Sequence, residues 1–380
     1  MANPHGLKVS CKDCGKVSSL PTLKHKQKAV CPRCGHTLLT YRHNETQITM
    51  AMASSAVVLL VLSLLFDFLT FKLNGQHHSV DLWAALAVLV DNDYLSLAIV
   101  TGLATVILPA VLLIGIFWLM WARMTHHYSP YLRRIYNMVM VALPWSMAEI
   151  FLVGILVSLI KITSLADIQV GPSFYTYFGF TVTMSIALFY FDASQTAYWV
   201  HGKKVPTEKP LTPHNATTSV QRTWALLLTA TLLYIPANTL PIMNTNVFGR
   251  NEPNTIIGGV ISLWEMGSYP IAIVILVASV VVPVAKILVL AWLNFSVQSG
   301  KLSNPHASTK YYRLVEWIGR WSMIDVFVVA ILVALIQLGN TLAIYPGPAA
   351  LAFCAVVFIT MIAAMTFDAR LIWQNRKSVV

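Results

Sequence analysis

Four of the five cysteines in this chain lie in two short knuckles near its N-terminus. The first reads Cys11-Lys12-Asp13-Cys14-Gly15 and the second reads Cys31-Pro32-Arg33-Cys34-Gly35. Paired Cys-x-x-Cys units at this separation can supply four thiolates to one tetrahedral metal ion, and the glycine after each pair lets backbone amides turn toward the sulfurs. The spacing therefore predicts a small ribbon domain over residues 1–48, with Cys11, Cys14, Cys31 and Cys34 as the metal ligands.

The chemistry of such a ribbon depends on the ion that it holds. A closed four-cysteine site leaves no open coordination position, which favours structural Zn²⁺. Rubredoxin-like iron is the alternative, because Cys-Pro-x-Cys-Gly also occurs in such electron carriers. No apolar signal segment precedes the knuckles, so we expect reduced thiols and not disulfides.

Three charged residues fall inside apolar stretches later in the chain. A charged side chain within a membrane costs about 2.5 to 3.5 kcal/mol on insertion scales, so such groups usually face other helices and find partners. One lysine and two carboxylates can form one neutral pair and leave one acid that gains by taking a proton. The predicted polar cluster consists of Lys286 paired with Asp325, the hydrogen-bonding neighbours Ser279, Ser322 and Thr360, and Glu149 as the group that changes protonation. A static cluster that only pins helices together is the alternative.

The composition identifies the elements that must hold these groups. Hydrophobic residues make up 57% of the chain and charged residues 11%, whereas about a quarter of the residues in an ordinary globular domain are charged. The mean hydropathy is +0.66. A spanning helix needs roughly 20 apolar residues, and eight stretches qualify, at approximately residues 49–71, 95–122, 137–161, 174–200, 222–244, 269–295, 321–339 and 348–372. The predicted fold class is an all-α polytopic membrane protein.

The apolar stretches fall into two copies of one unit. The segment from Trp145 to Ala193 recurs without a gap from Trp321 to Ala369. Such self-similarity indicates a repeated architecture. We therefore predict two homologous four-helix repeats at residues 49–204 and 222–380, joined by a cytoplasmic linker at residues 205–221. Pro109 aligns with Pro283, which places Leu112 opposite Lys286, so the repeats share their acids but not their base.

The net charge of +11 is explained by topology. Of the 26 lysines and arginines, all but Lys72, Lys161, Arg250 and Lys286 fall on one side of an eight-span arrangement. Cytoplasmic loops carry the excess of basic residues in membrane proteins. The pattern predicts that both termini are cytoplasmic and argues against nucleic-acid binding.

Residues near the ends of the spans suggest smaller features. Residues 79–94 and 256–269 read as amphipathic helices on the outer face of the membrane. Asp192 and Asp368 are expected to cap helix ends or to pair with arginines such as Arg370. Tryptophans at the cytoplasmic ends are expected to act as interfacial anchors, among them Trp373.

No enzymatic motif is present. The sequence lacks a phosphate-binding loop, a Gly-x-Ser-x-Gly elbow and a His/Asp/Glu set at metalloenzyme spacing. We therefore expect a protein that is not an enzyme.

Two four-span repeats, a Cys-x-x-Cys-Gly ribbon, the Trp-Ser-Met-x-Asp/Glu stretch and Ile235-Pro236-Ala237-Asn238 together resemble the paraquat-inducible protein A family. The resemblance covers nearly the whole chain. It implies a component of the bacterial inner membrane in Gram-negative cells, working with a periplasmic MCE-domain protein and carrying phospholipid. Each half of such proteins often begins with a cysteine ribbon, but the loop before the second half has no cysteine here.

The functional prediction is a multi-pass inner-membrane component that passes phospholipid to or from the MCE-domain protein, with proton coupling through the polar cluster. Two other classes stay open from the sequence. A redox membrane protein would require iron in the ribbon, and a passive anchor for the MCE-domain protein would tolerate replacement of the charged cluster.

Overall fold

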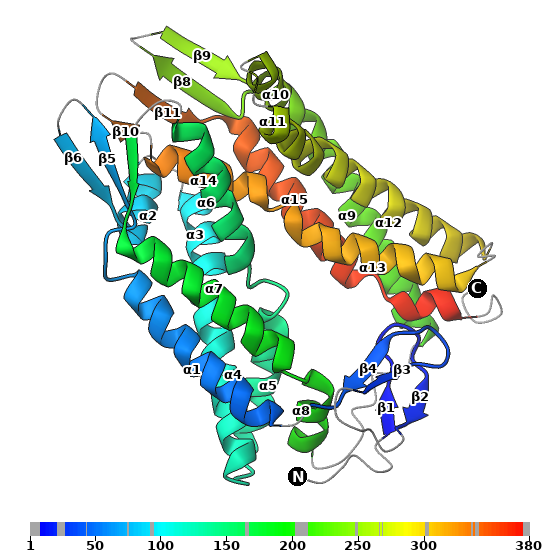
Figure 1. Ribbon diagram of the computed structural model, residues 1–380. Helices are drawn as coiled ribbons and strands as arrows, with labels where there is room; N and C mark the ends of the chain where they lie inside the picture. Colours follow the sequence, from blue (N-terminus) through cyan, green and yellow to red (C-terminus); the bar gives the residue numbers. More distant parts are fainter. Residues whose placement is uncertain are drawn as a thin grey trace.

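The computed structural model is mostly helical. It describes residues 8–20, 27–42, 44–73, 76–91, 95–163, 167–201, 212–247, 250–265, 267, 269–300, 304–335, 337–338 and 342–374. A small ribbon and two helical halves follow one another along the chain. Figure 1 shows the halves as two long bundles, with the ribbon at one end.

The ribbon consists of two β-hairpins. β1 (Lys8–Ser10) pairs with β2 (Val17–Ser19), and β3 (Lys28–Val30) pairs with β4 (Thr37–Thr40). Each hairpin carries one Cys-x-x-Cys pair in its turn, and the following Gly15 and Gly35 have φ values of +70° and +68°. Glycine adopts this left-handed conformation without steric cost, which lets its N–H group donate to the carbonyl of the first cysteine of the pair.

The first half begins immediately after the ribbon. In chain order its elements are α1 (Glu45–Ser63), β5 (Leu69–Leu73), β6 (Gln76–Val80), α2 (Leu82–Asp91), α3 (Leu95–Gly102), the π-helical turn η1 (Leu103–Ile107), α4 (Leu108–Met124), α5 (Tyr131–Ala142), α6 (Ala148–Thr163), β7 (Asp167–Val170), α7 (Pro172–Tyr190) and α8 (Ala193–Val200).

The second half follows the same order with two differences. Its elements are α9 (Pro213–Thr239), β8 (Met243–Val247), β9 (Arg250–Asn254), α10 (Ile256–Glu265), α11 (Tyr269–Leu276), the π-helical turn η2 (Val277–Val281), α12 (Val282–Ser299), α13 (Pro305–Trp321), α14 (Ile324–Leu335), β10 (Gln337–Leu338), β11 (Leu342–Pro346), α15 (Pro348–Thr366) and the 3₁₀ helix η3 (Ala369–Trp373). β10 has no counterpart among the described residues of the first half, and η3 stands where α8 would be.

Four helical segments in the described part of the chain are long and apolar enough to cross a membrane. They are Glu45–Ser63, Leu95–Met124, Ala272–Ser299 and Pro348–Thr366, and a fifth is gained if α7 and α8, which are bent by 62°, form one span. The predicted stretch 137–161 is divided between α5 and α6, because Pro144 lies between them and proline cannot continue a helix. The stretch 321–339 contains the short α14, and 222–244 falls on α9, which begins earlier and includes Arg222.

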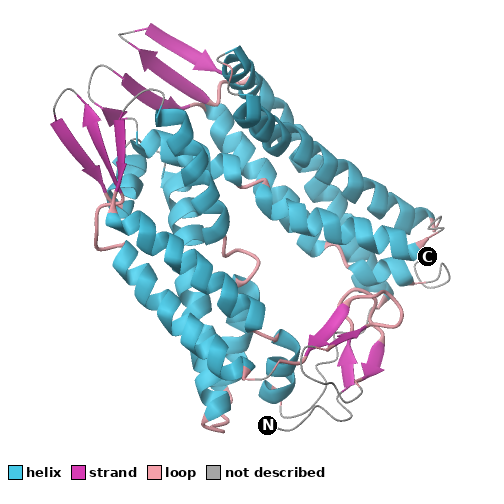
Figure 2. Cartoon of the chain, in the orientation of Figure 1, coloured by secondary structure: helices cyan, strands magenta, loops and turns pink. Residues whose placement is uncertain are grey.

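Two sheets at the end remote from the ribbon were not predicted from the sequence. One has the order β6-β5-β7 and the other β10-β11-β8-β9, with antiparallel pairing between neighbours. Figure 2 shows both sheets together at one end of the molecule, beyond the helices. The predicted amphipathic segments correspond to α2, which β6 precedes, and to α10.

A glycine follows the last strand of each sheet and enters the next helix. Gly171 donates its N–H to Phe68 O, and Gly347 donates to Ile242 O. A Cβ atom at these positions would collide with the backbone carbonyls of Asp67 and Pro241, respectively. The two halves therefore use glycine for the same close approach between backbones.

The halves meet mainly through α6 and α14. Within the first half α1 packs on α4 and α7, and within the second half α9 packs on α12 and α15. Between the halves, the rings of Phe151 and Phe327 lie edge to face at 5.5 Å, and the backbone of Gly154 lies against Phe327. Figure 1 shows the two bundles diverging from this contact toward the ribbon, which lies near α8 and η3.

Candidate functional site

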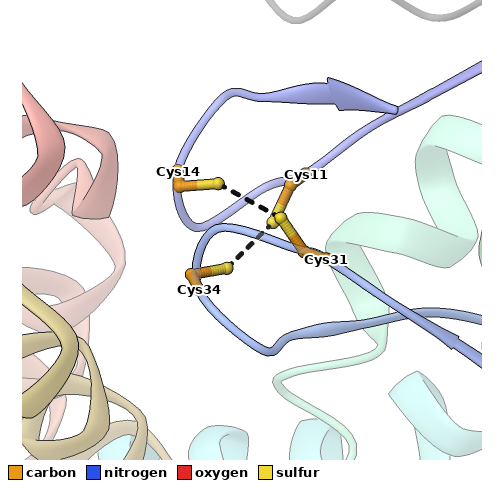
Figure 3. A group of neighbouring side chains, drawn as sticks. All are labelled: Cys11, Cys14, Cys31 and Cys34. Carbon is orange, nitrogen blue, oxygen red and sulfur yellow. Dashed lines mark hydrogen bonds between the residues drawn. The ribbon is translucent and has the colours of Figure 1, made fainter. Parts of the chain in front are cut away.

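The four predicted metal ligands converge in the ribbon. The Sγ atoms of Cys11, Cys14, Cys31 and Cys34 all lie within 4.8 Å of one another, and all four residues are buried. Figure 3 shows the two turns facing each other with the thiols directed to one point. The Sγ atoms of Cys11 and Cys34 are 3.4 Å apart and those of Cys14 and Cys31 are 3.5 Å apart, which is much longer than the ~2.05 Å of a disulfide bond. The cluster could therefore bind a metal ion.

The backbone prepares the second knuckle for this role. Burial alone would raise the pKa of the Cys31 thiol, but hydrogen bonds from the backbone N–H groups of Arg33 and Cys34 outweigh it and lower that pKa to about 7. Burial raises the pKa of the Cys14 thiol to about 11. Metal binding requires thiolates, so a bound cation would supply the charge compensation that the buried Cys14 lacks. The donor set fits a soft, tetrahedrally coordinated ion.

Asp13 connects the knuckles to the helices. Its carboxylate pairs with Arg313 of α13 at 2.6 Å and lies 3.1 Å from His36 Nδ1. Burial favours a higher pKa for this carboxyl, but hydrogen bonds and charge from His36 and Arg313 bring it below its usual value. The Arg313 guanidinium also donates to Cys34 O at 3.2 Å and lies 3.6 Å from Cys34 Sγ. Groups of this kind orient metal ligands and tune their charge.

A second candidate site surrounds Lys286 on α12. The residue is 1% exposed, and its ammonium donates to Ser322 Oγ at 3.3 Å and lies 3.5 Å from Gly319 O. Gly319 lies beside it, and a Cβ atom at that position would be 3.5 Å from Lys286 Cε, an ordinary contact distance. Among the described side chains, no carboxylate forms an ion pair with Lys286.

Among the described side chains, one predicted member of the polar cluster contacts Lys286. Ser322 contacts Lys286 directly, whereas Ser279 and Thr360 are buried and donate to carbonyl groups of their own helices, those of Ile275 and Val357. Asp325 belongs to α14, but its side chain lies outside the described residues. The predicted pair between Lys286 and Asp325 therefore stays a prediction.

Glu149 lies in the other half, at the start of α6. Its carboxylate accepts a hydrogen bond of 2.5 Å from Ser185 Oγ of α7, and the residue is exposed on the surface of the chain. The structure does not show it in contact with Lys286. The predicted participation of Glu149 in one cluster with Lys286 therefore stays a prediction.

Asp192 and Asp368, which lie at helix ends, behave as predicted. Asp192 accepts from the N–H groups of Ser194 and Gln195 at the start of α8. Asp368 accepts from the N–H of Arg370 and forms an ion pair with its guanidinium at 2.6 Å. Trp373, in contrast, packs against the core of the ribbon. The prediction of an interfacial anchor did not include this contact with protein.

The sequence analysis assigned no role to Arg313, although comparison of the two halves marks its position. The repeat aligns Arg313 with Asn137, so the second half gains a basic residue where the first half has none. Nothing in its local sequence distinguishes it from other arginines of the chain, because its partners lie about 280 to 300 residues away.

Comparison with known proteins identifies relatives along the whole chain. The model of the family described as paraquat-inducible protein A matches residues 46–201 and again residues 220–377. The intermembrane transport protein PqiA of Escherichia coli is 37% identical, covering 97% of this chain and 96% of that protein. A probable intermembrane transport protein of Haemophilus influenzae is 26% identical, over 96% of this chain and 95% of that protein.

A further relative carries a different name. Lipophilic envelope-spanning tunnel protein A of Escherichia coli is 26% identical, over 99% of this chain and 93% of that protein. No solved structure matches the chain.

Proposed function

Because the chain belongs to the paraquat-inducible protein A family, we propose that it is an inner-membrane component of an intermembrane transport system that passes phospholipid to or from a periplasmic MCE-domain protein. The observation that carries this proposal is the near full-length match to proteins named for intermembrane transport. A relative named as an envelope-spanning tunnel protein supports a partner that reaches across the periplasm.

The distribution of charge supports the orientation. We place the ribbon and both termini in the cytoplasm, where the basic loops belong, and the two sheets on the periplasmic side, where the MCE-domain protein would be met. In this arrangement eight apolar stretches cross the membrane, with α6 and α14 as short spans at the centre. Their short length is compatible with burial between the two bundles, since protein neighbours replace part of the lipid contact.

The ribbon then holds structural Zn²⁺ through its four cysteines. Four buried thiols at one point support a closed coordination shell. The colour of the purified protein and a metal analysis distinguish Zn²⁺ from iron in this site, because Zn²⁺ has a filled d shell and its protein is colourless. A zinc-loaded, colourless protein would exclude the rubredoxin-like redox function.

We propose that phospholipid passes through a groove between or beside the two bundles. Lys286 is the working part of the second bundle. The described residues offer this buried ammonium a hydroxyl and a carbonyl group, and we propose that Asp325 completes its surroundings, so that movements of α12 against α13 change its free energy. Proton binding at Asp325 or Glu149 would couple to such movements.

A lipid-transfer assay tests this function. Protein in liposomes with labelled phospholipid donates to the MCE-domain partner, and Lys286→Ala is compared with the wild type and with Lys310→Ala, which removes an exposed lysine of α13. We expect transfer to fall to background in Lys286→Ala and to be unchanged in Lys310→Ala. Metal content and partner binding are measured on the same preparations. Full transfer by folded Lys286→Ala would instead identify a passive anchor for the partner.

A further inference from the structure

We propose that the metal-loaded ribbon is a clamp that holds the two halves together at their cytoplasmic ends. Arg313 is the residue that binds the second half to the ribbon. The ribbon contacts both halves, but it does so with different parts. This proposal rests on the four-cysteine centre and not on the cargo that the protein carries.

The first half holds the ribbon through residues outside the knuckles. Ser194 Oγ of α8 donates to Leu38 O at 3.1 Å, and Asp192 accepts from the N–H of Thr40 at 3.4 Å. Arg42 donates to Phe189 O, and its guanidinium lies 3.8 Å from the centre of the Phe189 ring. These contacts involve β4 and the segment after it, which leads directly into α1. Because β4 continues directly into α1, the chain keeps the ribbon beside the first half whether or not metal is bound.

The second half is held by the knuckles themselves. Arg313 of α13 pairs with Asp13, between the first two cysteines, and donates to the carbonyl of Cys34. Arg33, between the other two cysteines, donates to Trp373 O at 2.8 Å and lies 5.0 Å from the centre of the Trp373 ring. Each of these ribbon residues is within a turn whose shape depends on the cysteines around it.

The chemistry of Arg313 makes its contacts with the ribbon sensitive to metal binding. Its guanidinium lies 3.6 Å from Cys34 Sγ, so it faces a thiolate when metal is bound. Charge-assisted hydrogen bonds of this kind are roughly twice as strong as neutral ones. Without metal the thiols have no common ion to hold the turns in place, since small ribbons of this type depend on metal for folding. Asp13, Arg33 and Cys34 then lose their fixed positions relative to α13 and η3.

The ribbon can therefore lose its contacts with the second half while it stays attached to the first half. The two bundles meet near the sheets through α6 and α14, and the ribbon connects them at the other end (Figure 1). Loss of metal frees the cytoplasmic end of the second half while leaving the ribbon attached to the first. The metal centre therefore sets how far the bundles can separate.

Distance measurements test the clamp. Spin labels are introduced as non-canonical amino acids at the exposed positions Tyr131 of α5 and Lys310 of α13, which leaves the cysteines intact. The distance distribution is measured by pulsed electron resonance in the metal-loaded protein, after metal removal by a chelator, and in the variants Arg313→Ala and Arg33→Ala. Arg222→Ala removes an exposed arginine from α9 of the same half and serves as the matched control.

We expect metal removal and Arg313→Ala to broaden the distribution and to shift it to longer distances, with a smaller shift for Arg33→Ala and none for Arg222→Ala. Metal analysis must show that Arg313→Ala retains its ion, so that the shift reports the lost contact and not a lost ribbon. An unchanged distribution in both the metal-free protein and Arg313→Ala would overturn the clamp. Lipid transfer plays no part in this readout, so the clamp and the proposed transport function can fail separately.

Discussion

The two halves share their scaffold but not their charges. Each has a long helix with a π-helical turn before a proline, a short central helix and a glycine behind its sheet. At the equivalent positions, the second half has Lys286 for Leu112, Gly319 for Leu143 and Arg313 for Asn137. The comparison shows that the second half has a buried lysine and an arginine in contact with the ribbon at positions where the first half has uncharged residues.

The largest effect concerns the metal. Replacing Cys31 by Ser removes one of four ligands, and we expect the bound metal to fall from about one ion per chain to near zero, because structural sites of this type bind as a closed set. Cys354→Ser is the matched control, since this buried cysteine lies far along the chain on α15 and outside the cluster. Elemental analysis of both proteins makes the measurement. A Cys31→Ser protein with full metal content would contradict the assignment.

Exchanging the core residues at one aligned position sharpens the difference between the halves. Leu112 is fully buried, so Leu112→Lys should destabilise the protein by about 3 kcal/mol, the cost of a charge inside a membrane helix. Lys286→Leu should also destabilise the protein, by about 3 to 5 kcal/mol, because in the predicted pair it leaves Asp325 as a buried acid without its base. Unfolding in detergent measures both. If Leu112→Lys were as stable as the wild type, the first half would accommodate a charge equally well.

A smaller effect is expected at Gly319. Gly319→Leu copies Leu143 of the first half and fills the space beside Lys286, so we expect a loss of about 1 to 3 kcal/mol from overpacking. Gly319→Ala places a methyl group at an ordinary contact distance from Lys286 and should cost much less. Thermal unfolding of the pair checks this. Equal melting temperatures for the two variants would show that the pocket around Lys286 is not tightly packed.

The smallest predicted change in stability concerns Asp192 and Asp368, the aspartates that cap helix ends at equivalent positions of the two halves. Asp192→Ala and Asp368→Ala each remove a side-chain cap, and we expect each to cost about 1 kcal/mol. Asp192→Asn and Asp368→Asn keep an acceptor oxygen and should restore most of the stability. The measurement is again thermal unfolding. Because Asp368 also pairs with Arg370, a much larger loss for Asp368→Asn than for Asp192→Asn would reveal that the ion pair matters more than the cap.

Much of the helical scaffold could be predicted because it is encoded locally. Apolar stretches, Cys-x-x-Cys spacing and the repeat are visible in short windows of sequence. The clustering of Cys11, Cys14, Cys31 and Cys34 follows from their spacing alone. Lys286 was expected to lie among other helices because it falls within an apolar stretch, and Ser322 was predicted as one of its hydrogen-bonding neighbours.

The rest depends on partners far away in sequence. β5 forms its sheet with β7, nearly 100 residues later, and β8 pairs with β11 at a similar separation, so no short window identifies these strands. Glu149 accepts a hydrogen bond from Ser185 of the next helix, a contact that the sequence did not predict. The contacts of Arg313 with the ribbon join residues near opposite ends of the chain, and no local sequence pattern predicts them.

The π-helical turns η1 and η2 set the angular phase of the helices that follow them. Such turns arise when one extra residue is accommodated within an α-helix, and each residue of an α-helix rotates the chain by about 100°. Deleting a single residue from Val277–Val281 would therefore turn α12 relative to α11 and carry Lys286 away from Ser322. The position of the buried lysine is thus fixed by the length of the turn before it as much as by the side chains around it.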